Sequence, residues 1–357
     1  MANNNINDSI KICSLNCRGL NDKVKRRDVL KYIRKKKFSI YCLQDVHWGK
    51  KWENMVRSEW GYETFVAGNT TNSRGVAILM NNNFDFKIRN VQRDKDGNWI
   101  ILDIAIFCLY GPNDDQPNFY NNMKEMIDNI GNPYCIICGD FNLVQNQTLD
   151  TYNYVNINNP KAKEAVLNMK EELGLSDPWR VLNPDTKRYT WRKSNPVKQA
   201  RLDFFLISSE LLNFIDLAEV MPGYRTDHSM VVIGLDRNNS ITRGRGSWKL
   251  NNELLKEEEY VNLVKDTITK VKKIYAASPY SRENINDINP NELELTISDQ
   301  LFFETMLMEI RGTTLAFSSK RKKKIDKTEE NLENTIQSLE KMLEEALLDD
   351  KQISERF

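Results

Sequence analysis

Between Ile10 and Leu235, short runs of β-branched and aromatic residues alternate with amphipathic helical segments, and this alternation constrains the fold most. Asn, Gly and Pro residues, which are typical of turns, separate the runs. The pattern predicts strands at residues 10–15, 39–44, 62–66, 75–80, 84–92, 100–109, 134–138, 189–193, 201–207 and 229–234. Apolar residues at three-to-four spacing predict helices at residues 22–36, 118–130 and 160–173. We therefore expect an α/β sandwich of layered sheets, with functional residues in the loops at one rim.

The character of the chain changes after Leu235. Residues 237–248 contain Arg243-Gly-Arg-Gly246 and predict a linker, so residues 1–236 form the expected first domain. Residues 249–357 are rich in Glu, Lys and Leu and predict an all-helical extension. A coiled-coil-like helix or one arm of a bundle is indicated by apolar residues at alternating four and three spacing, namely Leu332, Ile336, Leu339, Leu343 and Ala346.

The basic run Lys320–Lys324 in this extension has two interpretations. It fits a solvated helix face, and it also fits a nuclear-import signal or a phosphate-binding patch.

The charge balance, the hydropathy and the cysteines restrict which ligands the chain can bind and in which cell compartment it is expected. The 51 Lys and Arg residues nearly cancel the 50 Asp and Glu residues, so affinity for a polyanion has to come from local patches. No apolar run has membrane-spanning length, and the polar start lacks the apolar core of a signal peptide. Most cysteines stand in β-like runs, where free thiols pack as small hydrophobes, which indicates a reducing compartment, the nucleus and cytoplasm. Cys135 and Cys138 form a CxxC, but a strand turns them to opposite faces, which favours core packing over zinc.

Short polar islands concentrate Asn, Asp, His and Tyr at predicted strand ends. The most specific is Gly139-Asp140-Phe141-Asn142, because the preceding strand delivers an Asp and an Asn on one face with an apolar residue between them. An Asx turn that closes a strand is the alternative interpretation. The other islands are Ser14–Asn16, Leu43–Asp45, Tyr110–Asn113, and Arg201–Asp203 together with Thr226–His228.

In order and spacing, these islands resemble the endonuclease/exonuclease/phosphatase superfamily, which includes deoxyribonuclease I, abasic-site endonucleases and LINE-type retrotransposon endonucleases. The resemblance covers Ile10 to Leu235. Features that look like the retrotransposon branch are the segments Leu15–Leu20, Gln44–Trp48, Tyr189–Trp191 and Gly246–Asn251. The resemblance implies a four-layer, deoxyribonuclease I-like α/β sandwich followed by the helical extension, which would be the spacer before a reverse transcriptase.

The resemblance also implies a metal site. Hydrolysis of a phosphodiester requires charge neutralisation, and Mg²⁺ prefers oxygen ligands. Asp45 stands at the family's metal-ligand position, Asn16 would orient that ligand or a metal-bound water, and Asp227 resembles a secondary ligand. The family usually has Glu where this chain has Asp45, and the shorter side chain favours the more tolerant Mn²⁺.

The catalytic and substrate-binding roles follow from the same resemblance. Asp140 matches the residue that activates the nucleophilic water, with Asn142 beside it. His228 matches a phosphate-binding imidazolium that Asp203 holds in place. Tyr110, a further catalytic residue, and Asn113 match positions that contact the scissile phosphate. At substrate-side positions, Arg201 would contact a phosphate and Thr190 would hydrogen-bond near the cleavage site, whereas His47 is interpreted as a turn histidine without chemistry.

Two further features depart from the family pattern. The run Asn98–Leu109 contains no residue that favours a hairpin turn in its interior, which predicts a sheet one strand short. Nothing in the chain resembles a reverse transcriptase, which indicates a truncated copy or a fragment.

The resemblance to the retrotransposon branch implies a Mg²⁺-dependent DNA endonuclease that nicks one strand and leaves a 3′-OH, as in target-primed retrotransposition. Retrotransposon RNA or protein is the expected partner of the helical tail, and no membrane is involved. Because every polar island precedes the linker, a fragment that ends at Leu235 is expected to retain activity. Two alternatives stay open: another phosphoesterase, such as an abasic-site endonuclease or a lipid or inositol phosphatase, and a catalytically dead remnant that acts as a nucleic-acid-binding or coiled-coil module.

Overall fold

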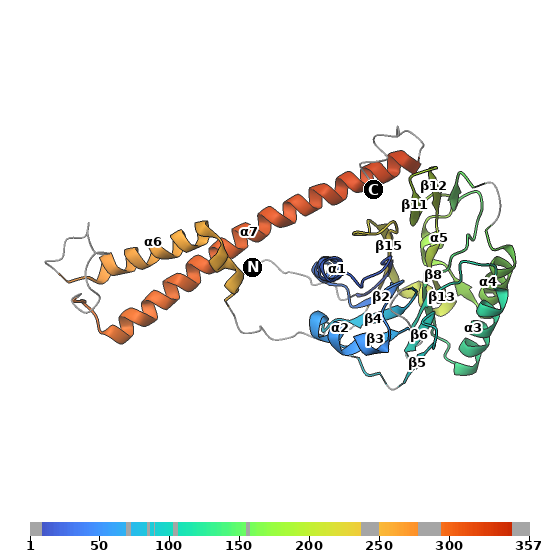
Figure 1. Cartoon of the computed structure of the whole chain (residues 1–357), viewed down its shortest axis with the longest axis horizontal. Coiled ribbons are helices and arrows are strands. Elements are labelled where there is room, and N and C mark those ends of the chain that lie inside the picture. The colour runs from blue at the N-terminus through green and yellow to red at the C-terminus, as the bar shows by residue number, and fades with distance from the viewer. Residues whose placement is uncertain are drawn as a thin grey trace. The chain divides into compact units, whose positions relative to one another are not determined.

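The computed structural model describes residues 9–68, 73–83, 86–88, 90–102, 106–154, 158–236, 250–277 and 294–344. The chain divides into two compact units, one comprising residues 1–242 and 336–357 and the other residues 243–335 (Figure 1). None of the described helices combines the length and the apolar character needed to cross a membrane. The predicted linker, residues 237–248, and Ala346 lie outside the described residues.

The first unit contains two six-stranded sheets and a small three-stranded one. In each large sheet one central pair of strands is parallel, and the other neighbours are antiparallel. The parallel pairs are β1 (Ile10–Asn16) with β2 (Ile40–Gln44) and β7 (Ile106–Tyr110) with β8 (Ile136–Asp140). The first sheet has the order β14 (Ile215–Met221), β15 (Met230–Leu235), β1 (Ile10–Asn16), β2 (Ile40–Gln44), β4 (Val76–Met80) and β3 (Thr64–Ala67). The second has the order β10 (Leu175–Ser176), β13 (Asp203–Ser208), β8 (Ile136–Asp140), β7 (Ile106–Tyr110), β6 (Trp99–Leu102) and β5 (Val91–Arg93). The small sheet has the order β11 (Trp191–Lys193), β12 (Lys198–Ala200) and β9 (Thr151–Tyr152).

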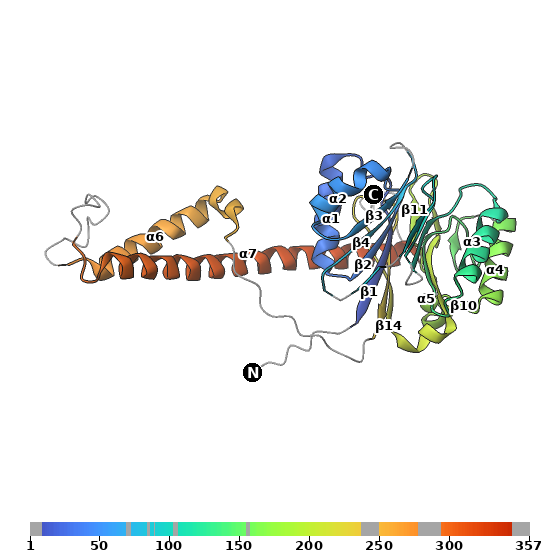
Figure 2. The same ribbon diagram turned by 90° about the horizontal axis from the view of Figure 1, so that it is seen from below.

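The two large sheets pack face to face, and helices cover their outer faces (Figure 2). Alternation along each strand decides which layer a side chain joins: Ile12 lies in the cluster between the sheets, whereas Cys13 lies under the first sheet's helices. Those helices are α1 (Lys23–Lys36) and α2 (Glu53–Trp60), while α3 (Pro117–Ile130) and α4 (Pro160–Glu172) cover the second sheet. Shorter helical elements are η1 (Lys50–Trp52), α5 (Pro178–Leu182) and η2 (Ser209–Phe214). This is the predicted four-layer sandwich.

The expectation that the sheet lacks one strand before Tyr110 is wrong. β6 and β7 form an antiparallel pair in which Leu102 lies opposite Ile106, so both strands are present. Residues 103–105, which connect them, lie outside the described residues. Pairing with a neighbouring strand, rather than a local turn signal, divides this apolar run into two strands.

The sequence also missed elements with weak patterns. β14 consists mainly of half-buried residues together with the exposed Asp216 and Glu219, so its apolar residues do not form a clear alternating pattern. The helix α2 spans only eight residues, too few for a clear helical period. In the run predicted at residues 84–92, only the end belongs to a strand, β5, and residues 84, 85 and 89 lie outside the described residues. Cys135 and Cys138 pack in different clusters on opposite faces of their sheet, as expected.

The described part of the second unit is mainly helical. It contains η3 (Asn252–Lys256), α6 (Glu258–Tyr275) and the part of α7 (Asp299–Glu344) up to Thr335. The helices α6 and α7 pack antiparallel, because Tyr260 contacts Phe317 while Tyr275, at the other end of α6, contacts Phe302. The basic run Lys320–Lys324 is exposed, in agreement with a solvated helix face. The coiled-coil pairing of residues 332–346 stays a prediction.

The close approach of β7 and β8 predicts a sharp sensitivity at Gly139. A Cβ added there would lie 1.9 Å from the carbonyl oxygen of Leu109, and the φ of +153° is one that side chains rarely adopt. Gly139→Ala should therefore destabilise the fold by at least about 3 kcal/mol in urea denaturation. Gly131→Ala is the matched control, because its added Cβ meets nothing within 4 Å although φ is +61°. Equal unfolding midpoints for the two variants would contradict this packing.

Candidate functional site

The topology brings the polar islands to one edge of the sandwich. The first sheet contributes the ends of the parallel strands β1 and β2, with Asn16 opposite Gln44. The second contributes the ends of the parallel strands β7 and β8, with Tyr110 opposite Asp140. Because β13 runs antiparallel to β8, its first residue Asp203 pairs with Asp140 at the same edge. Residues far apart in the sequence thus meet at one rim.

A pocket of about 310 Å³ opens at this rim. Predicted residues that line it are Asn16, Asp45, Tyr110, Asn113, Asp140, Asn142, Asp227 and His228. The sequence analysis did not single out five further lining residues, Arg18, Tyr154, Asn158, Trp191 and Leu202. Thr190 and Arg201 are not among the residues that line the pocket.

Asp140 is buried and its carboxylate is held from two sides. One oxygen accepts a hydrogen bond from the Asn16 side chain at 2.8 Å, and the other accepts one from the backbone N–H of Asn142 at 2.9 Å. Burial raises the pKa of Asp140 to about 7, with a further contribution from the negative charge of Asp203. A carboxylate that takes up a proton near neutral pH is suited to act as a general base.

His228 lies opposite, and Asp203 holds its ring. The Nδ1 atom lies 2.8 Å from an oxygen of Asp203, and Nε2 lies 4.0 Å from the Asp140 carboxylate. Burial lowers the pKa of His228, but the charge and hydrogen bond of Asp203, together with Asp140, outweigh burial and raise the pKa to about 9. The ring is therefore an imidazolium at neutral pH and can donate to an anion in the pocket.

Thr190 stabilises the backbone at Asp203 and lies outside the pocket lining. Its buried hydroxyl oxygen accepts hydrogen bonds from the backbone N–H groups of Leu202 and Asp203, both at 3.0 Å. The predicted contact between Thr190 and substrate does not fit this geometry. The side chain fixes the start of β13 and hence the position of the Asp203 carboxylate.

The predicted phosphate contact of Arg201 is also wrong. Arg201 is 2% exposed, and its guanidinium donates to Asp150 at 2.8 Å and to Asp177 at 2.6 Å. Two carboxylates therefore compensate the buried cation, and loss of either partner would leave an unpaired charge. From the sequence alone, a structural arginine cannot be distinguished from a phosphate-binding one.

Asp45 and His47 form a pair that the sequence analysis missed. The Nε2 atom of His47 lies 3.0 Å from the Asp45 carboxylate. Both residues have a positive φ, +61° for His47 and +49° for Asp45. Gly19 leaves room for this ring, because a Cβ there would lie 2.9 Å from its Nδ1. His47 therefore orients the Asp45 carboxylate; the only sequence signal was its position two residues after that acid.

Tyr110 contributes a neutral donor to the pocket. Burial raises the pKa of its phenol far above the ordinary value, and the charges of Asp45 and Asp140 add to this effect. Asn142 stands beside it with a left-handed φ of +49°, and its side-chain amide donates to the carbonyl of Gly111 at 2.7 Å. The pocket thus combines neutral donors, carboxylates and one imidazolium.

The donor set of the site fits a divalent metal ion. Ligand-type atoms of Asp140, Asp203 and His228 lie within 4.8 Å of one another. His228 and Asp203 bond to each other through Nδ1, and the second oxygen of Asp203 is buried and finds no hydrogen-bond partner among the described residues. Asp45 and Asp227 add further carboxylates at the pocket wall. Oxygen ligands of this kind suit hard cations.

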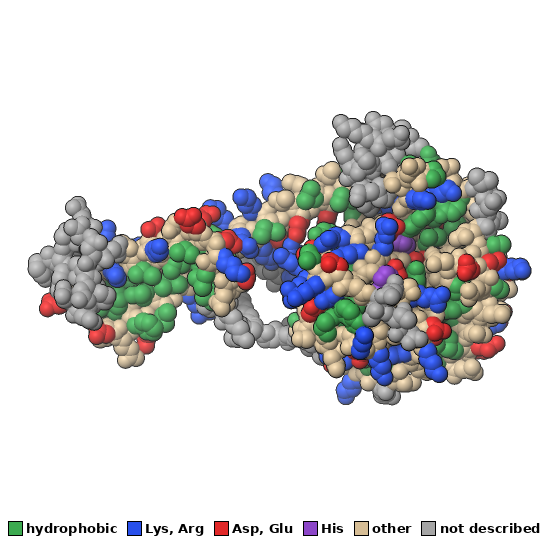
Figure 3. Space-filling model, viewed as in Figure 1, with side chains coloured by type: hydrophobic (Ala, Val, Ile, Leu, Met, Phe, Trp, Pro, Cys, Tyr) green, Lys and Arg blue, Asp and Glu red, His purple; other side chains and the backbone are tan. Residues whose placement is uncertain are grey.

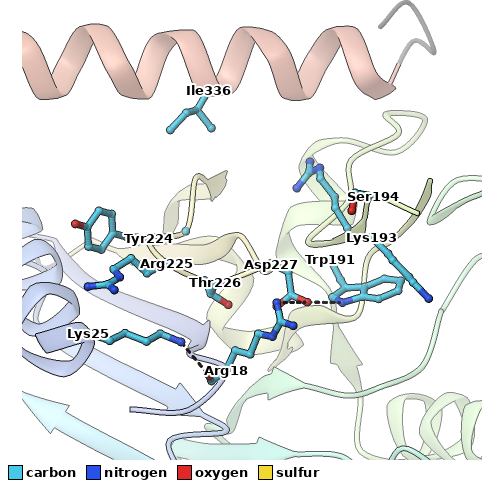
Figure 4. A pocket seen from close by; sticks show the side chains of 12 residues that line it. Arg18, Lys25, Trp191, Lys193, Ser194, Tyr224, Arg225, Thr226, Asp227 and Ile336 are labelled. Atoms are coloured by element: carbon cyan, nitrogen blue, oxygen red, sulfur yellow. Dashed lines mark hydrogen bonds and ion pairs between the residues drawn. The ribbon is translucent and has the colours of Figure 1, made fainter. Parts of the chain in front are cut away.

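A larger groove of about 890 Å³ adjoins the pocket and shares Arg18, Trp191 and Asp227 with it (Figure 4). Lys25 of α1 and Arg225 of the loop before His228 also line this groove. Burial lowers the pKa of Lys25, and the positive charges of Arg18 and Arg225 lower it further. Lys and Arg side chains are also frequent on the surface around the histidines (Figure 3). Crowded cations of this kind favour an anionic ligand.

Comparison with known proteins agrees with this architecture. Residues 13–228 match the model of the Endonuclease/Exonuclease/phosphatase family. Over 275 residues, or 72% of this chain, the sequence is 25% identical to a Transposon TX1 uncharacterized 149 kDa protein from Xenopus laevis. The match comprises 20% of that protein, so the chain spans about a fifth of its relative's length.

Three solved structures share the fold, each over 64% of this chain. The 3′ phosphatase NExo from Neisseria, bound to a product DNA hairpin, is 20% identical with a TM-score of 0.55, and all of its chain is covered. The 3′-5′ exonuclease NExo from Neisseria meningitidis is 20% identical with a TM-score of 0.53, also over its whole chain. The AP endonuclease LMAP from Leishmania major is 16% identical with a TM-score of 0.56 over 88% of its chain. At these identities the likeness establishes the fold alone.

The paired ionisable groups predict a bell-shaped pH dependence for any hydrolysis at this site. Asp140 is an anion only above about pH 7, and His228 is a cation only below about pH 9. The single-turnover rate should therefore fall on the acid side as Asp140 is protonated and on the alkaline side as His228 loses its proton. Rates measured across this range test both limbs. A rate that keeps rising above pH 9 would exclude the imidazolium as the active form.

Proposed function

Because the chain belongs to the endonuclease/exonuclease/phosphatase family, we propose that it is a Mg²⁺-dependent endonuclease that nicks one strand of DNA and leaves a 3′-OH end. One observation carries this proposal: the Asp140 carboxylate and Nε2 of the His228–Asp203 pair lie 4.0 Å apart in one pocket, with opposite charges between about pH 7 and about pH 9. A base for the attacking water and a neighbouring cationic donor for a phosphate oxygen are what hydrolysis of a phosphodiester requires.

Each residue takes a separate part in the proposed reaction. Asp140, oriented by Asn16, accepts the proton of the attacking water. His228 donates to a non-bridging phosphate oxygen and stabilises the charge that develops there. Asn142, Tyr110 and Asn113 line the same pocket and supply neutral donors to the phosphate.

The proposed metal site is on the wall formed by the first sheet. We assign Asp45 as ligand, Asn16 as the residue that orients it or its water, and Asp227 as a secondary ligand. Mg²⁺ bound there would neutralise phosphate charge as a Lewis acid. The shorter reach of Asp compared with Glu favours partial replacement of Mg²⁺ by Mn²⁺.

The choice of DNA as substrate rests on two observations. The basic groove beside the pocket suits a polyanionic strand, and the relative from Xenopus laevis is a transposon protein. We therefore place the activity in target-primed retrotransposition in the nucleus, after synthesis in the cytoplasm. Retrotransposon RNA or protein is the proposed partner of the helical tail. Abasic-site cleavage, phosphatase activity and catalytic inactivity are the competing outcomes.

A supercoiled plasmid tests the proposal directly. The wild-type chain should convert it to the open-circle form, and the nick should support extension by a DNA polymerase without phosphatase treatment. Asp140→Asn and His228→Gln should each lower the nicking rate by at least about a hundredfold, because each removes a proton-transfer or charge-stabilising group. Asp128→Asn, an exposed substitution on α3, is the matched control.

Three parallel substrates separate the alternatives. An intact plasmid, an abasic-site oligonucleotide and an inositol polyphosphate are offered at equal enzyme concentration. Cleavage confined to the abasic oligonucleotide, release of phosphate alone, or no turnover of any substrate would each overturn the nicking proposal.

The role of Asp45 predicts a change in metal dependence. Asp45→Asn should nearly abolish nicking, because it removes the proposed ligand charge. Asp45→Glu should change the metal concentration for half-maximal rate and the ratio of Mg²⁺ to Mn²⁺ activity, because the carboxylate moves by about one methylene. Titrations of both metals for the wild type, the two variants and Asp128→Asn decide the question. Identical curves for the wild type and Asp45→Asn would remove Asp45 from the metal site.

A further inference from the structure

Glu340, near the carboxyl end of α7, is an acidic residue with no exposed surface. It belongs to the first compact unit, together with the residues it contacts. One carboxylate oxygen lies 3.0 Å from Arg188 Nη2, and the other lies 3.5 Å from Arg192 Nη1. Acidic residues are almost never fully buried unless they are paired, so this position requires the two arginines.

Arg192 connects Glu340 to the loop of residues 222–229, which carries His228 and is called the catalytic loop below. Its side chain is 1% exposed, and Nη1 also donates to the hydroxyl of Ser229 at 2.9 Å. Its backbone N–H donates to the carbonyl of Asp227 at 3.2 Å. Arg192 therefore holds the residues on both sides of His228. Its Nε donates to Gln199 on β12, which fixes the guanidinium from a third direction.

The residue before Arg192 contacts the same loop. The indole N–H of Trp191 donates to the Asp227 carboxylate at 3.3 Å, and the backbone of Trp191 forms an isolated bridge with His228. Arg188 donates to the carbonyl of Val220 on β14. Segments that carry the two arginines thus border the loop before β15.

The negative charge of Glu340 compensates the positive charge of Arg192, which lies beside the loop that carries His228. Without the carboxylate, the nearly buried cation of Arg192 would lose a compensating charge close to His228. Removal of one partner from a buried ion pair is strongly destabilising, and the remaining charge moves toward water or another acceptor. For Arg192, such a movement strains its bonds to Ser229 and Asp227, and with them the backbone on both sides of His228.

We infer that Glu340 is a positioning residue for the catalytic loop, which it holds through Arg192. The expected effect of Glu340 on the nicking rate rests on the proposed function. The expected effect of Glu340 on the position of His228 does not. It also changes the expectation for a fragment that ends at Leu235: such a fragment lacks Glu340 and should nick DNA more slowly. Ile336, one turn earlier on α7, lines the basic groove beside the pocket (Figure 4).

The kinetic test compares full-length variants. Glu340→Gln keeps the shape of the side chain and removes its charge, and Glu330→Gln, exposed on the same helix, is the matched control. Glu340→Gln should lower kcat for plasmid nicking about tenfold with little change in KM for DNA, because a misplaced catalytic group affects the transition state most. Unchanged kcat, or a raised KM with unchanged kcat, would overturn the inference.

Circular dichroism and thermal unfolding give the folded fraction to which each kcat is normalised. A loss of activity that merely follows the folded fraction would also overturn the inference. If Glu340→Gln fails to fold, Arg192→Lys takes its place, since it keeps a cation near Glu340 but cannot donate to Glu340, Ser229 and Gln199 at once. Arg192→Lys should lower kcat per folded molecule; an unchanged value would count against the inference.

A nuclear magnetic resonance measurement tests the inference without catalysis. The chain has two histidines, His47 and His228, so their ring nitrogens can be assigned by a single substitution. Glu340→Gln should shift or broaden the His228 ring signals and leave those of His47 in place, whereas Glu330→Gln should change neither. Unchanged His228 signals in Glu340→Gln would overturn the inference. Because this readout does not require turnover, a wild type that fails to nick DNA would refute the proposed function and leave the positioning test intact.

Discussion

The site depends on the buried hydrogen bond between Asp203 and His228, which is 2.8 Å long and joins the two large sheets at one rim. Asp203 begins β13 of the second sheet, whereas His228 stands two residues before β15 of the first. The bond therefore forms only when both sheets are in place and packed at the correct distance. Asp140, which pairs with Asp203 across the β8–β13 ladder, then has a cation within reach. Packing of the apolar faces thus sets the geometry of the polar groups.

Buried charges have two different uses in this molecule. Arg201 and its partners Asp150 and Asp177 compensate one another, so this network supports the fold but offers no free group to a ligand. Around the pocket the compensation is incomplete: an oxygen of Asp203 finds no partner among the described residues, and Asp140 is held by neutral donors. Unpaired polar atoms are costly in a protein interior, and the unpaired oxygen of Asp203 lies next to His228, where a bound ligand would compensate it.

The end of α7 extends this distinction to the helical part of the chain. Glu340 resembles Asp150 in being an acid fully buried against arginine, but one of its arginines also holds the loop that carries His228. A helix that the sequence assigns to a separate extension therefore contributes to the same compact unit as the pocket. A boundary drawn from composition and a boundary drawn from contacts need not coincide, because a few buried side chains suffice to join distant segments.

Local pattern and residue chemistry were enough to predict much of this protein. Strand and helix periods indicated the sandwich, and the polar islands indicated Asn16, Asp140, Asn142 and His228, which line one pocket. Local pattern could not divide residues 98–109 into β6 and β7, since that division depends on pairing between strands. It also could not separate Arg201 from a phosphate-binding arginine, or link His47 to Asp45 and Glu340 to Arg192. Such roles depend on which side chains meet: Asn16 and Asp140 are 124 residues apart in the sequence, and only the packing of the two sheets brings them to 2.8 Å.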